Sequence, residues 1–297
     1  MLTRKLAMLN AIAQHPSNSS ARLRSVLYFL AWRARCRFAN RPMTIPFVAS
    51  TRLFVYETGA SSQVLARGLF EYNDMIFAMR YLRKEDTAVD VGANDGVFTV
   101  LFAAYSGRVH AIEPHPESYR RLLAQLTLNG LSNAVPHEAA VGEASGEVWF
   151  TNCSDSTENR VQSTSTEGAH RVRLARLAEL VNEPAALVKV DVEGLELSVL
   201  RGAGQLKQCP VWIVEVNGRC RDYGVALSDI YDAFADAGYA PHAYTAATSE
   251  LTPVPRGTEV HGGNVLFIRS VASVSARLAE VQSRPALARP AWRELFL

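Results

Sequence analysis

From Thr87 onward, short apolar segments alternate with helical patterns along the chain. Five segments rich in β-branched residues predict buried strands: 88–91, 109–112, 187–190, 211–214 and 265–268. Residues 97–105, 118–129 and 228–237 carry apolar side chains at helical spacing, and Ser228 is placed to cap the last of these helices. Strands that alternate with helices predict a doubly wound, mostly parallel α/β sheet that binds ligands at the carboxyl ends of its strands.

The first 65 residues form a basic N-terminal extension, in which the first acidic residue is Glu57. A helical stripe is formed by Leu23, Val26, Leu27, Leu30, Ala34 and Phe38, whereas Phe29 and Trp32 fall outside it. We expect a helix that ends before Pro42 and packs on the main domain. A peripheral membrane contact through residues 20–40, or a dock for an anionic substrate, is the other interpretation.

Composition and charge mainly exclude classes of partner, metal site and membrane segment. The chain has 297 residues and a formal net charge of +2, which is too small to indicate a nucleic-acid partner. The four cysteines (Cys36, Cys153, Cys209 and Cys220) form no metal-binding pair, so reduced thiols in a cytoplasmic protein are expected. The longest apolar run near the N-terminus, 26–32, is too short for a signal sequence or a membrane span.

A polar segment at 151–168 interrupts the alternation of strands and helices. It lies between 147–150 and 171–174, which could pair as strands. The segment is either a substrate loop at the rim of the sheet or a flexible insertion. Farther on, the tail at 271–297 begins with Val274 and Leu278 at helical spacing.

The strongest local signal is the glycine loop, Asp90-Val-Gly-Ala-Asn-Asp-Gly96, between a predicted strand and a predicted helix. It lacks the Gly-Lys-Ser/Thr of a Walker loop, and its GxxxG spacing differs from the GxGxxG of dinucleotide sites. This difference argues against a nicotinamide dehydrogenase. The carboxylates of Asp90 and Asp95 favour a cationic ligand, such as a sulfonium that carries an α-amino group.

Further acidic residues follow other strands. Glu113 closes the next predicted strand, where a carboxylate can accept hydrogen bonds from both hydroxyls of a ribose. Lys189, Asp191 and Glu193 occupy alternate positions after another predicted strand begins, so they point the same way if the strand runs that far. Charges at the mouth of a buried strand are costly, so we favour a functional role over an ion pair that only seals the strand.

Several of these segments together resemble the FkbM family of S-adenosylmethionine-dependent methyltransferases. The matching segments are DVGANDGVFT (90–99), AIEPHP (111–116), HEAAVG (137–142), VKVDVEGLELSVLRGA (188–203), EVN (215–217) and NVLFI (264–268). The resemblance covers about residues 68–270. It implies a class I, Rossmann-like methyltransferase domain at 66–270 with an antiparallel last strand, preceded by the extension at 1–65 and followed by the tail at 271–297.

The resemblance also implies roles for single residues. The methionine part of S-adenosyl-L-methionine would be surrounded by Asp90, Gly92, Ala93, Asn94 and Gly96. Glu113 would hold the ribose, Glu138 and Ala139 would flank the adenine, and Asp191 would lie near the methyl group. Glu71 would close over the donor.

The family suggests O-methylation of a small-molecule or glycan hydroxyl, including natural-product acceptors. A hydroxyl must lose its proton, so a general base is expected. Asp191 is the first candidate, and Glu193 and Glu215 are alternatives. The same three carboxylates could bind a divalent metal, although metal dependence is not expected. The histidines, including His115, His137 and His261, are interpreted as scaffolding.

Two other functions remain open. An RNA methyltransferase would use the basic extension to bind its substrate, and its RNA binding would depend steeply on salt. A catalytically silent module would be recruited to membranes by residues 20–40 and would not turn over the donor.

Overall fold

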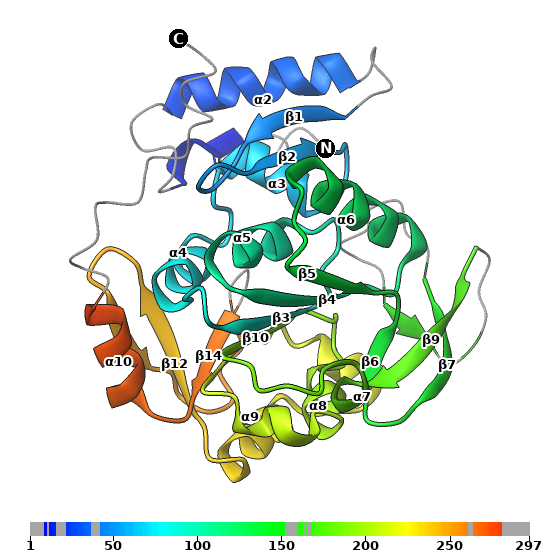
Figure 1. The fold of residues 1–297 in the computed structure, drawn as a ribbon, viewed down its shortest axis with the longest axis vertical. Coiled ribbons are helices and arrows are strands. Elements are labelled where there is room, and N and C mark those ends of the chain that lie inside the picture. The colour runs from blue at the N-terminus through cyan, green and yellow to red at the C-terminus, as the bar shows by residue number, and fades with distance from the viewer. Residues whose placement is uncertain are drawn as a thin grey trace.

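The computed structural model describes residues 9–10, 12–15, 22–36, 42–151, 160–162, 164, 168–260 and 264–280. Its centre is an eight-stranded sheet in the order β13-β12-β14-β11-β10-β3-β4-β5 (Figure 1). The strands are β3 (Thr87–Val91), β4 (Arg108–Ile112), β5 (Ala134–His137), β10 (Leu187–Val190), β11 (Val211–Glu215), β12 (Ala240–Thr245), β13 (Glu250–Pro253) and β14 (Asn264–Ile268).

The pairing of these strands confirms the predicted doubly wound, mostly parallel sheet. Strands β5, β4, β3, β10 and β11 run parallel to their neighbours, and β14 pairs with β11 in the antiparallel direction. The carboxyl ends of the parallel strands therefore lie at one edge of the sheet. The chain order changes direction between β3 and β10, which is where such sheets bind ligands.

Helices cover both faces of this sheet (Figure 1). On one face lie α4 (Tyr72–Tyr81) and α5 (Val97–Tyr105), and on the other lie α8 (Glu196–Arg201) and α9 (Leu227–Asp236). Helix α5 is apolar all round because it is buried between the sheet and α4. The first helix of the predicted tail, α10 (Val271–Ala279), packs on the core through Val274 and Leu278.

A second sheet flanks the polar segment. It contains β6 (Ala140–Gly142), β7 (Gly146–Phe150), β8 (Val161–Gln162) and β9 (His170–Arg176), in the order β6-β9-β7-β8. The predicted pairing is confirmed, since Glu147 lies opposite Arg173 in the antiparallel pair of β7 and β9. Most of the polar segment lies outside the described residues, so its role as a substrate loop stays a prediction.

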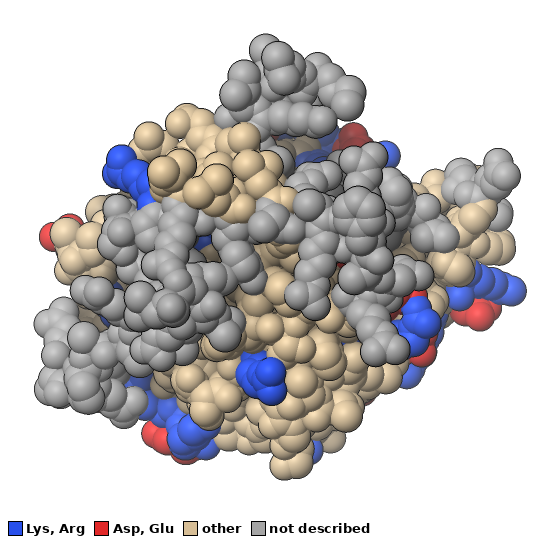
Figure 2. All heavy atoms as spheres, turned by 90° about the horizontal axis from the view of Figure 1, so that it is seen from above, with Lys and Arg blue, Asp and Glu red and all other residues tan. Residues whose placement is uncertain are grey.

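The N-terminal layer lies above α5 and α6 (Pro116–Asn129) in Figure 1. It contains α2 (Arg22–Cys36), the hairpin of β1 (Met43–Pro46) and β2 (Arg52–Val55), and α3 (Ala60–Arg67). None of the described helices has the length and apolar character needed to cross a membrane. Figure 2 looks down on this end, where the described Lys and Arg side chains are scattered rather than gathered in one patch.

Helix α2 packs as expected, but the predicted face was wrong. Leu23, Leu27 and Leu30 are 73%, 57% and 45% exposed, whereas Phe29 and Trp32 are 5% and 4% exposed. The two aromatic rings contact each other at a centroid distance of 5.7 Å. Large aromatic side chains bury more apolar area than the leucines would, and this outweighs the regular leucine spacing. The predicted membrane contact through residues 20–40 stays a prediction.

Two predicted helix starts were also wrong. Helix α9 begins at Leu227, one residue before the serine expected to cap it, and the Asp229 carboxylate accepts a hydrogen bond from the backbone N–H of Ala226. Helix α6 begins at Pro116 rather than residue 118, because the His115 ring accepts a hydrogen bond from the backbone N–H of Ser118. Both differences stay within one turn of helix.

Candidate functional site

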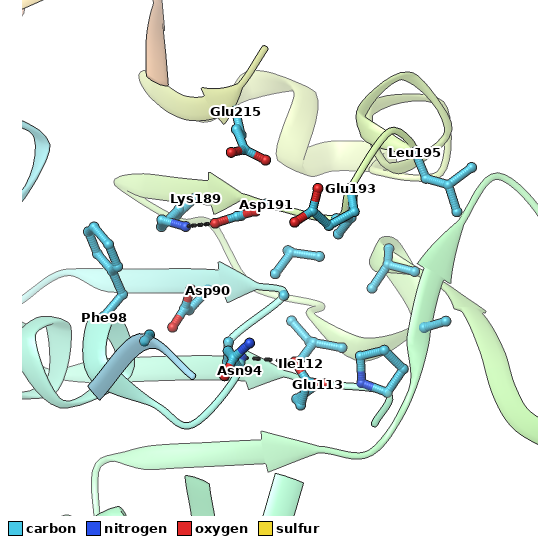
Figure 3. A pocket seen from close by; sticks show the side chains of 18 of the residues that line it. Asp90, Asn94, Phe98, Ile112, Glu113, Lys189, Asp191, Glu193, Leu195 and Glu215 are labelled. Carbon is cyan, nitrogen blue, oxygen red and sulfur yellow. Dashed lines mark hydrogen bonds and ion pairs between the residues drawn. The ribbon is translucent and has the colours of Figure 1, made fainter. Parts of the chain in front are cut away.

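A cavity of about 280 Å³ lies at the carboxyl ends of β3, β4, β10 and β11. Figure 3 shows how the acidic side chains from these strand ends gather around it. Most of the residues predicted from the sequence line this cavity: Glu71, Asp90, Gly92, Ala93, Asn94, Glu113, Ala139, Asp191, Glu193 and Glu215. The volume is close to the lower limit of ~300 Å³ for small-molecule sites.

The glycine loop approaches β10 so closely that a side chain would not fit. Gly92 has a φ of +83°, and a Cβ added there would lie 1.8 Å from the carbonyl oxygen of Asp191. The backbone N–H groups of Gly92 and Ala93 donate to the Ile112 carbonyl at 2.9 and 3.0 Å. These contacts hold the loop against β4 and the end of β10. Because glycine has no side chain, a ligand can also approach the loop backbone closely.

Asp90 places an unpartnered carboxylate oxygen at the cavity. Its side chain is 1% exposed, and Oδ2 accepts a hydrogen bond from the Thr99 hydroxyl at 2.6 Å. The other oxygen, Oδ1, has no hydrogen-bond partner in the described part of the chain. Burial raises the pKa of Asp90, and the nearby Lys189 ammonium opposes that shift. A buried carboxylate oxygen in this position is suited to a cationic group.

Glu113 is held by main-chain donors. Its two carboxylate oxygens accept hydrogen bonds from the backbone N–H groups of Asn94 and His115, each at 2.8 Å. Burial raises the pKa of Glu113 to about 7, although these hydrogen bonds favour the ionised form. Each oxygen keeps acceptor capacity for a ligand, because a carboxylate oxygen has two lone pairs.

The buried Lys189 side chain forms an ion pair with the partly exposed Asp191, with Nζ and Oδ2 2.9 Å apart (Figure 3). The Lys189 ammonium also lies 4.6 Å from the centroid of the Phe98 ring. Burial opposes the ionised form of Asp191, but the Lys189 charge and the hydrogen bonds from Lys189 and Glu215 together outweigh it and lower the pKa of that carboxyl. Strand β10 ends at Val190, so the predicted alternation does not extend to Glu193, which has a φ of +56°. Lys189 and Asp191 nevertheless meet, and both line the cavity.

The other two predicted acids lie beside Asp191. Glu193 receives an ion pair from Arg219 at 3.0 Å, and the Asn217 amide donates to Glu215 at 2.9 Å. Oxygen atoms of Asp191, Glu193 and Glu215 all lie within 4.8 Å of one another. Carboxylate oxygens at this spacing could bind a divalent cation. The expectation that methyl transfer does not depend on a metal therefore stays a prediction.

The crowding of these acids perturbs their titration. Burial, with the Asp191 charge beside it, raises the pKa of Glu193 to about 7. The same two influences raise the pKa of Glu215 to about 10, so its carboxyl is protonated at neutral pH and hydrogen-bonds to Asp191. Among the three, Asp191 is therefore the most fully ionised near pH 7, whereas Glu193 is only partly ionised there.

Glu71 lies between α3 and α4, where it accepts a hydrogen bond from the Asn264 amide at 2.7 Å. Burial raises the pKa of Glu71 to about 7, and Lys189 opposes the shift. Asn264 begins β14 and also lines the cavity. No role for Asn264 was predicted from the sequence, although the NVLFI segment that contains it is part of the resemblance to the family.

Three sequence expectations do not match the cavity. Gly96 has a φ of +87° and faces Leu122 of α6, and Glu138 is exposed; neither lines the cavity. Asp95 is completely buried and accepts hydrogen bonds from the backbone N–H of Ser61 at 3.0 and 3.2 Å, so it holds α3 instead of facing a ligand. The motif predicts that a loop lies at the site, but not which way each of its residues faces. The conformation of the loops directs these three residues away from the cavity.

Two of the three singled-out histidines are within the described residues. His115 caps α6, and the His137 ring lies 3.0 Å from that of His110. Both contacts agree with the scaffolding interpretation. His261 lies outside the described residues.

Gln63 and Arg67 of α3 also line the cavity, although no sequence motif indicated them.

Comparisons with known proteins identify methyltransferases. Residues 90–241 match the model of the methyltransferase FkbM domain. The hexuronic acid methyltransferase AglP of Haloferax volcanii is 29% identical over 159 residues, which make up 52% of this chain and 63% of that protein. The chain thus spans less than two thirds of that relative's length.

Solved structures match more weakly. The methyltransferase FkbM from Methylobacillus flagellatus is 16% identical, with a TM-score of 0.44, over 70% of this chain and 52% of that chain. The tRNA m1G37 methyltransferase of M. jannaschii is 12% identical, with a TM-score of 0.41, over 77% of this chain and 56% of that chain.

Proposed function

The chain belongs to the FkbM methyltransferase family, and we propose that it transfers the methyl group of S-adenosylmethionine to a hydroxyl oxygen of a glycan or natural-product acceptor. One observation carries the proposal. Asp90, Glu113 and Asp191 follow or end three neighbouring strands of a doubly wound sheet and line a single cavity. All three lie within the segment that matches the family model.

The cavity suits the chemistry of the donor. When bound, S-adenosylmethionine supplies a methyl group on a positively charged sulfonium, which is already activated for transfer. The unpartnered Asp90 oxygen would accept from the α-amino group, and Glu113 would accept from the ribose hydroxyls. Gly92 permits the close backbone approach that a ligand in this loop needs, and Ala139 would flank the adenine.

Asp191 is the proposed general base. A hydroxyl acceptor must lose a proton, and a positioned base contributes ~10²–10⁴-fold to such a step. The Lys189 ion pair keeps Asp191 ionised, while the acidic form of Glu215 donates a hydrogen bond to it. Glu193 is the alternative base, because its pKa of about 7 leaves it partly ionised at neutral pH.

The acceptor class is inferred from the curated relative, which is named for hexuronic acid. A hexuronic acid offers both hydroxyl and carboxylate oxygens to a methyl donor. Methylation of a hydroxyl yields an ether, whereas methylation of the carboxylate yields an ester. Only the hydroxyl requires a base, so we favour it for a site that contains Asp191.

The test uses labelled S-adenosylmethionine with two acceptors, methyl glucuronide and methyl glucoside. We expect a labelled product that survives mild alkali, because ethers are stable where esters hydrolyse. An alkali-labile product would overturn the hydroxyl assignment and retain the methyltransferase. Absence of S-adenosylhomocysteine binding by folded protein would contradict the methyltransferase function itself.

A further inference from the structure

Two polar side chains of α3 line the cavity without a hydrogen-bond or ion-pair partner among the described residues. Gln63 and Arg67 lie four residues apart and therefore share one face of the helix, together with Ala60. Within the described ranges of the chain, neither side chain makes a hydrogen bond or an ion pair. The pair thus offers an amide and a guanidinium to whatever occupies the cavity.

The charges around the cavity make Arg67 unusual. Six carboxyl groups line it: Glu71, Asp90, Glu113, Asp191, Glu193 and Glu215. Only two cationic side chains line it among the described residues, and Lys189 is already paired with Asp191. Arg67 is half-buried, and burial lowers its pKa without a neighbouring carboxylate to offset the effect.

A guanidinium stays charged even when partly buried, so the lack of an anionic partner leaves its charge uncompensated. An anionic ligand would remove this cost. Elsewhere in the cavity the same ligand would lie beside the six carboxyl groups, and those that are ionised, such as Asp191, would repel it. The cavity therefore has one place for a carboxylate, at the face of α3.

Contacts of α3 place this face on the donor side. The backbone N–H of Ser61 donates to both oxygens of Asp95, which belongs to the glycine loop. The rings of Phe70 and Phe98 meet edge to face at 6.2 Å, which joins the chain after α3 to the start of α5. Glu193 and Glu215, in contrast, come from the segments that follow β10 and end β11.

We infer that Arg67, with Gln63 beside it, binds the α-carboxylate of the methyl donor, while the unpartnered oxygen of Asp90 binds the α-amino group. This inference rests on the proposed function. It makes the cavity complementary to both charges of an amino-acid group. An acceptor carboxylate, such as that of a hexuronic acid, is the other source of the same chemistry.

The test is a calorimetric titration with two ligands that differ only in the carboxylate: S-adenosylhomocysteine and its decarboxylated analogue. The proteins are the wild type, Arg67→Gln, Arg67→Lys and the control Arg120→Gln, whose side chain is 71% exposed on α6. Arg67→Gln should weaken S-adenosylhomocysteine by at least ~10-fold, the scale of a charge-assisted hydrogen bond, and leave the analogue within ~2-fold. Arg67→Lys should lie between these values, and Arg120→Gln should match the wild type.

Three results would overturn the inference. Unchanged S-adenosylhomocysteine affinity in Arg67→Gln would mean that Arg67 does not contact the donor. Equal weakening of both ligands, with or without a lower melting temperature, would mean that Arg67 acts through the fold. In a further titration, glucuronate is added to protein saturated with S-adenosylhomocysteine. If Arg67→Gln weakens glucuronate binding and leaves the affinity for S-adenosylhomocysteine unchanged, Arg67 belongs to the acceptor site. Failure of the wild type to bind S-adenosylhomocysteine would instead contradict the proposed function.

Discussion

The cavity has two halves that hold their carboxylates by different means. In the half that we assign to the donor, Glu113 is fixed by backbone N–H groups and Asp90 by a buried hydroxyl. In the half that we assign to the acceptor, which contains Asp191, Glu193 and Glu215, the partners are the side chains of Lys189, Arg219 and Asn217.

This difference separates binding from proton transfer. Main-chain donors are set by loop geometry and carry no titratable charge, so they hold an acceptor group in one orientation. Ionisable side chains in close contact shift one another's pKa values and can share protons. The donor half is therefore built to position a ligand, and we expect the acceptor half to carry the proton chemistry.

The largest effect is expected for Asp191→Asn. This change should lower methyl transfer to a hydroxyl acceptor by ~10²–10⁴-fold, because the base is lost while the shape is kept. The affinity for S-adenosylhomocysteine should change by less than ~3-fold, under ~1 kcal/mol, because the proposed contacts with the donor are made by Asp90 and Glu113. Transfer rates with labelled donor and calorimetry measure the two effects.

The matched control for this variant is Glu143→Gln, whose side chain is 54% exposed and outside the cavity. A rate loss below ~10-fold in Asp191→Asn would contradict the base role. That result would be expected for a carboxylate acceptor, which has no proton to lose.

In the donor half, Glu113→Gln should weaken S-adenosylhomocysteine by ~1–3 kcal/mol, because an amide places a donor group where the ribose hydroxyls need an acceptor. Glu138→Gln is the comparison, since the sequence assigned Glu138 to the adenine and the structure leaves it exposed outside the cavity. We expect Glu138→Gln to bind like the wild type. If both variants weaken S-adenosylhomocysteine binding equally in a titration, Glu138 also contacts the ligand and the site extends beyond the cavity.

The affinity for S-adenosylhomocysteine should fall as the pH is lowered from 8 to 6. Burial raises the pKa of Glu113 to about 7, so acidification protonates the carboxylate that receives the ribose hydroxyls. The loss is limited to about 10-fold per pH unit below that pKa. Glu113→Gln should flatten the profile, and an unaltered profile in that variant would assign the pH dependence to Glu71 or Asp90.

The smallest effect is a gain in stability from Glu193→Gln at pH 8. The folded-state pKa of Glu193 is raised from 4.5 to about 7, so its contribution to stability is present below about pH 4.5 and is lost as the pH rises through 7. A neutral amide avoids this loss and should raise the melting temperature by a few °C at pH 8.

At pH 4.5 the wild type and Glu193→Gln should melt at nearly the same temperature, because the carboxyl is then protonated in the folded protein. A lower melting temperature for the variant at pH 8 would mean that the ion pair with Arg219 outweighs burial. Thermal unfolding monitored by circular dichroism measures this difference.

The sequence was sufficient to predict the acids at the strand ends. Asp90, Glu113 and Asp191 each accompany a strand with a clear apolar pattern, and parallel strands bring their carboxyl ends to one edge. The sheet and the pairing of β7 with β9 were predictable for the same reason, since they depend on local pattern. Gly92 was predicted from the glycine loop in which it lies. The structure supplies the reason for the glycine, since a Cβ there would collide with the backbone of Asp191.

Other features depend on tertiary packing and left no local signal. Arg67 lines the cavity only because α3 docks on the glycine loop through Asp95. The motif itself suggested that Asp95 faces a ligand. In α2, the leucine spacing indicated one packed face, yet Phe29 and Trp32 bury the other. A pattern of apolar residues gives the period of a helix but not which neighbour it meets.

The most direct test of the donor site is calorimetric titration of the wild-type protein with S-adenosylhomocysteine at pH 8. We expect one site per chain with a dissociation constant in the micromolar range, which corresponds to a binding free energy of about −8 kcal/mol. The absence of binding heat at two temperatures, in protein that circular dichroism shows to be folded, would contradict it. The cavity at the ends of β3, β4 and β10 would then have to bind a different ligand.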